Sequence, residues 1–139
     1  MLRFARLNTP LPQATAIALI SLLAAGCGQD GPPRYELSGK VTFRGQPVPA
    51  GTIIFEPDAS QGNDGPQGMA PIKNGLFDTS QGGRGTVGGP HTVTILGCDG
   101  VNVTETSPQG KPLFPPHVAT AAIPKQRGTL DFEVPAAKQ

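Results

Sequence analysis

The sequence contains few of the side chains on which many protein sites depend. Its 139 residues include no tryptophan, one tyrosine, two histidines and two cysteines, and 15% of the residues are charged. Glycan-binding surfaces commonly present exposed aromatic rings, which this composition scarcely offers. Neither a Gly-x-Ser-x-Gly elbow nor a glycine-rich loop ending in Lys-Ser/Thr occurs, so the sequence predicts neither that class of hydrolase nor a phosphate cradle.

An excess of charge of one sign is also lacking. The eleven basic and ten acidic residues nearly balance, and Arg3 and Arg6 lie in the first 26 residues, which contain no acid. The rest of the chain therefore carries nine basic residues (eleven minus two) and ten acidic residues. A net charge near −1 gives no electrostatic footprint for nucleic acid, and we expect no nucleic-acid partner.

Glycine and proline are abundant instead. Nineteen glycines and sixteen prolines make up about a quarter of the chain, and short alternating runs of β-branched and aromatic residues lie between them. This pattern is typical of a turn-rich all-β domain and argues against disorder. The length allows one domain of about 100 residues with a short extension, which can bury a sufficient core without metals or disulfides.

The first 26 residues have the composition of a secretory signal peptide. Two arginines precede ATAIALISLLAA, a run of twelve residues that are apolar or small. As a helix this run would rise about 18 Å, short of the roughly 30 Å hydrocarbon core of a bilayer, so it should not remain as a membrane span. The sequence therefore predicts a signal-peptide helix over residues 1–26 and export by the general secretion route.

Cys27 follows this run directly. The stretch LAAGC at residues 23–27 resembles the bacterial lipobox, in which a peptidase cuts before a cysteine that has received a diacylglyceryl group; the family prefers leucine where this chain has Ala24. The resemblance implies that Cys27 begins the mature protein and that its acyl chains anchor it to the periplasmic or cell-surface face of a bacterial membrane. A conventional signal peptide that ends at a cysteine is the alternative.

The remaining chain predicts a tether and one β domain. Residues 28–34, GQDGPPR, lack packable side chains, so residues 27–34 should form a flexible tether. From Tyr35 apolar and polar residues alternate in about seven short runs, and Asn74-Gly75 predicts a hairpin because both residues tolerate positive φ. We expect an all-β antiparallel β-sandwich over residues 35–135 and a disordered tail at 136–139. The side chains expected to face inward are Val41, Phe43, Ile53, Phe55, Phe77, Val93, Ile95, Leu130 and Phe132.

Five segments of this domain resemble those of a known family. They are SGKVTFRGQPVPAGTIIFEP, KNGLFDTS, GGPHTVTILG, PLFPPHV and GTLDFEVP, and together they extend through most of residues 35–135. In this combination the chain is similar to bacterial lipoproteins with a carboxypeptidase-regulatory-like, transthyretin-like domain. The resemblance implies an immunoglobulin-like or transthyretin-like sandwich that serves as a non-catalytic module at the cell surface. A hydrolase of the wider superfamily uses a terminal Tyr-Arg-Gly-Ser motif. Arg127-Gly128-Thr129 resembles this motif only superficially, so the sequence does not predict that activity.

Metal and thiol chemistry find little support in the sequence. Copper would need His91, Cys98, His117 and Met69 together, but Cys98 and His117 are not in one short loop as cupredoxin ligands are, and these residues also fall short of a zinc set. Calcium is the least implausible ion, because Asp58, Asn63 and Asp64 share one loop, although a solvated loop is the favoured interpretation. We therefore expect no metal or other cofactor, with Cys98 as a core or strand-end residue and an intermolecular disulfide or a reactive thiol as alternatives.

Two classes of function remain. The first is a membrane-anchored envelope lipoprotein whose β-sandwich has a structural or protein-interaction role, without enzymatic activity. The second is a module that binds carbohydrate or another small ligand. The first class is favoured because the domain lacks tryptophan, and an exposed Tyr35 or Phe114 beside polar groups would favour the second. The expected partners are the membrane, through lipid on Cys27, and envelope proteins or glycans.

Overall fold

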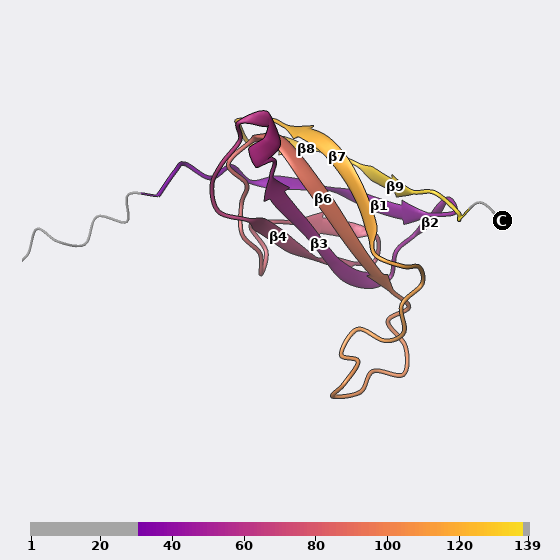
Figure 1. The fold of residues 1–139 in the computed structure, drawn as a ribbon. Helices are drawn as coiled ribbons and strands as arrows, with labels where there is room; N and C mark the ends of the chain where they lie inside the picture. Colours follow the sequence, from indigo (N-terminus) through magenta and orange to yellow (C-terminus); the bar gives the residue numbers. More distant parts are fainter. Residues whose placement is uncertain (1–30, 138–139) are drawn as a thin grey trace, which may run out of the picture. The chain divides into compact units, whose positions relative to one another are not determined.

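The computed structural model describes residues 31–137, and these residues form a β domain (Figure 1). The chain divides into two units, Met1–Gly31 and Pro32–Gln139, and the strands belong to the second. One 3-10 turn, η1 (Ala59–Gln61), interrupts the strands. The strands are β1 (Leu37–Phe43), β2 (Gln46–Pro47), β3 (Ala50–Pro57), β4 (Gly68–Lys73), β5 (Leu76–Asp78), β6 (Gly89–Cys98), β7 (His117–Ile123), β8 (Gly128–Thr129) and β9 (Phe132–Val134).

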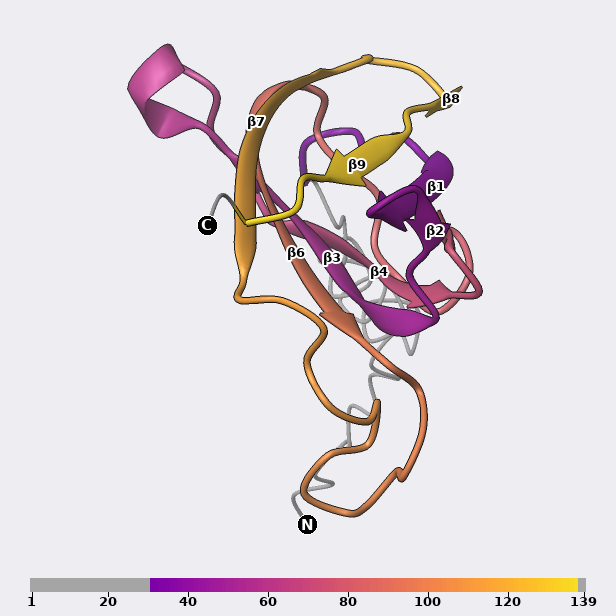
Figure 2. The same cartoon turned by 90° about the vertical axis from the view of Figure 1, so that its right-hand side faces the viewer.

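The strands form one strongly curled sheet. Its order is β2-β1-β5-β4-β3-β6-β7, and β8 and β9 also pair with β1. Figure 2 shows the sheet curling so that β9 and β7 face each other across the core. Most pairs are antiparallel, whereas β8 and β9 run parallel to β1. This arrangement is a β-sandwich or half-barrel, and the predicted all-β class is confirmed.

Local turn chemistry explains two of the hairpins. Asn74 and Gly75 both have positive φ, 51° and 75°, and join β4 to β5 as predicted. Arg44 and Gly45 also have positive φ, 53° and 73°, and join β1 to β2. Two-residue loops of this kind match the right-handed twist of the strands on either side.

The last strand region differs in detail from the predicted single strand over GTLDFEV. It consists of β8 and β9, with Leu130 and Asp131 between them. At this break the carboxylate oxygen Oδ1 of Asp131 accepts a hydrogen bond from the backbone N–H of Lys40 at 2.9 Å. A side chain therefore takes the place of a main-chain acceptor, and the ladder is interrupted.

The core lies inside the curl of the sheet. All nine residues predicted to face inward are buried or pack against the buried cluster, with Phe43, Leu130 and Phe132 half-buried. The rings of Phe55, Phe77 and Phe132 form a triangle with centroids 5.7–6.1 Å apart. Tilted aromatic contacts at such distances add about 0.5–1.5 kcal/mol per pair to the burial of apolar area.

The domain has two distinct ends, which we name by what enters or leaves there. At the N-terminal pole Tyr35 pairs with Thr86, just before β6 begins. At the loop pole β6 ends at Cys98 and the chain continues into residues 99–116, which extend well beyond the strands (Figures 1 and 2). The poles are separated by the ten residues of β6, about 30 Å of extended chain.

Several predictions concern residues outside those described. The signal-peptide helix over 1–26, the acylated Cys27 and the last residues of the tail fall in this group. Of the predicted tether, residues 31–33 are exposed, and the Arg34 guanidinium donates hydrogen bonds to the carbonyl oxygens of Gln67 (3.3 Å) and Gly85 (3.1 Å). Among residues 31–137 no helix has the length and apolarity of a membrane-spanning segment.

Candidate functional site

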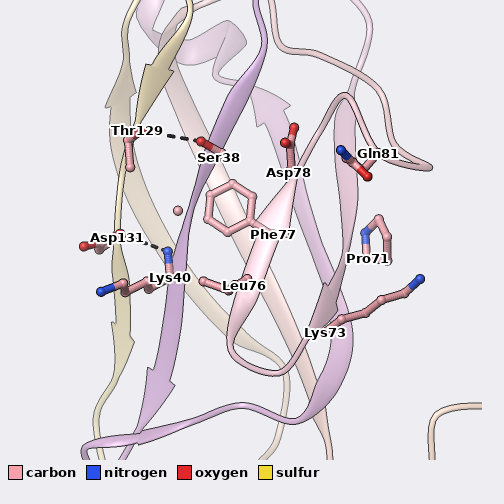
Figure 3. A pocket seen from close by; sticks show the side chains of 11 residues that line it. Ser38, Lys40, Pro71, Lys73, Leu76, Phe77, Asp78, Gln81, Thr129 and Asp131 are labelled. Atoms are coloured by element: carbon pink, nitrogen blue, oxygen red, sulfur yellow. Dashed lines mark hydrogen bonds between the residues drawn. The ribbon is translucent and has the colours of Figure 1, made fainter.

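A groove on the outer surface of the sheet is one candidate site. It has a volume of about 760 Å³ and lies over β1, β5, β4 and the chain around β8 (Figure 3). We call it the sheet groove. Its lining residues come from segments far apart in sequence: Ser38, Gly39, Lys40, Pro71, Lys73, Leu76, Phe77, Asp78, Gln81, Thr129 and Asp131.

One wall of the sheet groove depends on a close approach of two backbones. Gly39 lies at an inward position of β1, and a Cβ there would overlap the carbonyl oxygen of Leu130. Because glycine leaves this space free, the chain between β8 and β9 can lie directly against β1. The backbone N–H of Leu130 donates to the carbonyl oxygen of Ser38 at 2.9 Å, and the hydroxyl oxygens of Ser38 and Thr129 are 3.4 Å apart.

The centre of the sheet groove is apolar and its edges are charged. Leu76 is 55% exposed, beside the ring of Phe77, whose body is buried in the core. Lys40 and Lys73 supply positive charge on either side of Leu76, and Asp78 and Asp131 supply negative charge (Figure 3). This combination can hold a ligand by apolar contact while orienting charged groups of both signs.

Asp78 is fixed in its ionised form by a neighbouring turn. Its Oδ1 accepts hydrogen bonds from the backbone N–H of Ser80 at 2.9 Å and from the Ser80 hydroxyl at 2.6 Å. These bonds, with a smaller contribution from the positive charge of Arg127, hold the pKa of Asp78 below its usual value. The carboxylate is therefore charged at neutral pH and is used as an acceptor within its own turn.

In the loop with the calcium candidates, Asp58 and Asn63 are engaged in hydrogen bonds with other groups of the protein. The carboxylate of Asp58 accepts hydrogen bonds from the Ser60 hydroxyl, the Gln61 side chain and the Ser60 N–H, and these bonds, with the hydroxyl as the largest cause, lower its pKa. The Asn63 amide donates to the carbonyl oxygens of Gly88 and Pro90. Within residues 31–137, no group of three or more His, Cys, Asp or Glu residues is placed to hold a metal ion.

The four copper candidates are not brought together. His91 is 1% exposed and its Nδ1 lies 2.9 Å from the carbonyl oxygen of Gly89 at the N-terminal pole. Cys98 lies at the other end of β6, and His117 begins β7 opposite Ile95. Met69 is 37% exposed and pairs with Arg84. These four residues are therefore not gathered at one site.

Cys98 lies at the end of a strand, one of the positions that the sequence predicts for it, and Arg127 lies directly before a strand. Cys98 is the last residue of β6 and is half-buried; burial, with a smaller effect of the Asp99 charge, raises the pKa of its thiol. Arg127 is exposed directly before β8 and pairs with Glu36 at 2.9 Å. Ion pairs this exposed contribute about 0–1 kcal/mol to stability, so the pair is a minor feature of the surface.

The two aromatic residues that would favour glycan binding are each half-buried. Tyr35 takes part in the backbone pairing with Thr86. The Phe114 ring packs against Phe43, with ring centroids 4.7 Å apart and planes tilted by 49°. Neither ring is a freely exposed platform, although Phe114 borders a second groove.

The sequence alone does not reveal the sheet groove. Lys40, Leu76 and Asp131 belong to three segments whose adjacency depends on the pairing of β1 with β5 and with the chain near β9. One feature of the sequence did point to it, since Gly39 stands where an inward apolar side chain is expected. A glycine at such a strand position often marks a close backbone approach, as it does here.

Comparisons with models of protein families, with curated proteins and with solved structures found no match to this chain. The resemblance to lipoproteins with a transthyretin-like domain stays a prediction from the sequence.

Proposed function

We propose that the chain is an exported bacterial lipoprotein, anchored to a membrane by acyl chains on Cys27. The observation that carries this proposal is the position of Cys27, directly after a short apolar run and before the polar segment GQDGPPR. The apolar run is too short to span a bilayer, and the small residues Ala24, Ala25 and Gly26 offer a cleavage site before the cysteine. Two or three acyl chains would anchor the protein firmly, whereas one would not.

The β domain would then act as a non-catalytic module for structural or protein-interaction roles in the cell envelope. Two observations support this part of the proposal. The first is the similarity of the sequence to lipoproteins with a carboxypeptidase-regulatory-like domain. The second is that the domain begins within a few residues of Cys27, so that an anchored chain would hold it close to the membrane surface.

The anchor is tested by Cys27→Ser in the full chain expressed in a bacterium. Wild type should gain the mass of the acyl chains, begin at Cys27 and sediment with membranes, whereas the variant should lack both the lipid and the dedicated cleavage. Cys98→Ser is the matched control and should behave as wild type. A wild-type protein that begins at another residue, or that lacks the lipid mass, would contradict the proposal.

The sheet groove favours a second candidate function, the binding of a small ligand. Its volume of about 760 Å³ is in the range of small-molecule sites, and Leu76 offers an apolar contact between charged groups. A panel of oligosaccharides and short peptides, screened by thermal shift on wild type and Leu76→Ala, tests this candidate. A ligand that stabilises wild type but not Leu76→Ala supports it. Equal shifts for both proteins place binding elsewhere.

A further inference from the structure

We propose that a groove at the loop pole docks an extended peptide segment in which a carboxylate side chain stands next to apolar or proline residues. This inference names the partner of the interaction module proposed above and rests on that proposed function. The groove has a volume of about 470 Å³, and we call it the apolar groove. Its walls include Phe43, Leu113, Phe114, Pro115, Pro116 and Pro135.

Two packed aromatic rings form one wall of the apolar groove. Phe43 ends β1 and Phe114 lies near the end of the long loop, and both rings are half-buried. The Phe114 ring packs directly against Gly97 of β6. Glycine leaves room for the ring, because a Cβ at this position would overlap it. The wall is therefore preformed, which lowers the entropic cost of binding.

Prolines make the rest of the apolar groove stiff. Pro115 and Pro116 follow Phe114 directly, and Pro135 follows β9. A residue before proline is restricted to extended conformations, so this part of the loop loses little freedom when a ligand binds. Grooves lined by aromatic and proline residues suit extended segments, which present side chains at regular intervals and keep their own backbone groups solvated.

The positive charge at the edge of the apolar groove favours a ligand with a carboxylate. The Arg44 guanidinium carbon lies 5.0 Å from the centre of the Phe43 ring, so a permanent positive charge is held at the edge of the groove. None of the described lining residues is acidic. A carboxylate on the ligand would complement this charge, and hydrogen bonds from arginine to a carboxylate are among the stronger ones in proteins.

The position of the apolar groove suits a partner in the envelope. The chain reaches the domain at the N-terminal pole, where Tyr35 pairs with Thr86. An anchor at Cys27 attaches through that pole, so the loop pole is the end of the domain farther from the attachment. Val101 and Val103, in the long loop at this end, are 56% and 59% exposed. A long ordered loop with exposed apolar side chains is a common form of binding site.

The first experiment selects ligands from a random-peptide phage library on the immobilised full chain, purified in detergent. Recovered clones should carry Asp or Glu next to proline or a large apolar residue. The most enriched sequence is then synthesised with a fluorescein label and titrated by fluorescence anisotropy. Phe114→Ala should weaken its binding by about tenfold or more, and Arg44→Gln by about three- to tenfold.

Matched variants separate the apolar groove from other surfaces. Arg84→Gln removes an exposed arginine beside Met69, and Leu76→Ala removes an exposed apolar side chain in the sheet groove. Both should bind the peptide as wild type does. Arg44→Gln changes an exposed side chain, so it gives a clear result even if Phe114→Ala lowers the stability of the fold.

Several results would overturn the proposal. They are the absence of enriched clones, enrichment of basic peptides, or peptide binding that Arg44→Gln and Phe114→Ala leave unchanged. Binding of an oligosaccharide to the apolar groove, or dimerisation that both variants weaken while peptides fail to compete, would assign a different occupant. Cys27→Ser should leave the anisotropy titration unchanged, so failure of the anchor and failure of the groove are seen in different measurements.

Discussion

The two poles of the domain are built differently. At the N-terminal pole Leu37, Thr86 and His91 are each no more than 1% exposed. At the loop pole Val101 and Val103 are more than half exposed. The first pole excludes water from these three side chains, whereas the second leaves apolar area available for contact with another molecule.

The two poles also differ in whether their polar groups are buried or exposed. At the N-terminal pole the hydroxyl of Thr79 accepts a hydrogen bond from the buried N–H of Leu37 at 2.9 Å. His91 Nε2 and Thr86 Oγ1 are buried there without a partner among the described residues. Buried polar atoms without partners cost free energy, so this pole must gain enough from apolar packing to offset them. At the loop pole Asp99 makes its hydrogen bonds in an exposed setting, where water can replace them.

A matched pair of leucine substitutions should give the largest contrast between the poles. Leu37→Ala leaves a cavity in the core and should lower the free energy of unfolding by about 3 kcal/mol. Leu113 is 38% exposed, and Leu113→Ala should cost less than about 1 kcal/mol. Urea unfolding followed by circular dichroism measures both. Equal losses would show that the loop pole is as important for stability as the N-terminal pole.

Removal of one buried acceptor should have the next largest effect. Thr79→Val keeps the shape of the side chain but leaves the N–H of Leu37 unpaired, which should cost about 1–3 kcal/mol. Thr94→Val is the control, because Thr94 is half-buried on the outer face of β6, where the change should cost less than about 0.5 kcal/mol. If both variants melt at the same temperature, the hydrogen bond of Thr79 contributes little to the stability of the N-terminal pole.

At the loop pole, removal of the Asp99 carboxylate should increase the mobility of the long loop more than it lowers the stability of the fold. Asp99 Oδ1 accepts from the backbone N–H groups of Val101 (3.0 Å) and Lys111 (2.9 Å), which links the start of the long loop to residue 111 within it. Asp99→Ala should speed proteolytic cleavage within residues 99–116 several-fold while the free energy of unfolding changes by less than about 1 kcal/mol. Asp131→Ala removes a comparable acceptor beside Lys40 and should leave the loop cleavage unchanged. Unchanged cleavage in Asp99→Ala would mean that other contacts hold the loop.

Local patterns explain why much of the fold could be predicted. Alternation assigned Val41, Ile53 and Val93 to the core, and Asn74-Gly75 marked its hairpin, because both depend on residues close in sequence. The parallel pairing of β8 and β9 with β1 could not be predicted in this way. It depends on a long-range contact of Gly39 with Leu130 and on a side-chain acceptor, Asp131.

The candidate sites were less predictable than the fold. Each groove gathers side chains from segments far apart in sequence, such as Phe43 and Phe114 in the apolar groove. Alternation places Phe43 inward, but it does not show that Arg44 lies over its ring. Charge and exposure in a groove depend on which strands become neighbours, and this information is not present in a local pattern.

The smallest predicted effect is a change in the pKa of Asp78, whose carboxylate accepts hydrogen bonds at the surface of the domain. Ser80 donates two hydrogen bonds to Asp78 and is the main cause of its lowered pKa. Because the folded pKa lies below the unfolded value, the ionised carboxylate stabilises the fold above the unfolded pKa, and this contribution is lost as pH falls through the folded pKa. Ser80→Ala should therefore raise the pKa of Asp78 toward its usual value and make unfolding in acid begin at a slightly higher pH.

Titration of the Asp78 carboxyl carbon by NMR measures this pKa directly in wild type and Ser80→Ala. The backbone N–H of residue 80 remains in the variant, so part of the shift should persist and the rise should be incomplete. Ser60→Ala is the control, because it removes the equivalent donor from Asp58 and should leave the pKa of Asp78 unchanged. If Ser80→Ala leaves the Asp78 pKa where it is in wild type, the Ser80 hydroxyl is not its cause. The weaker influence of Arg127 would then be the first to test, with Arg127→Gln in the same titration.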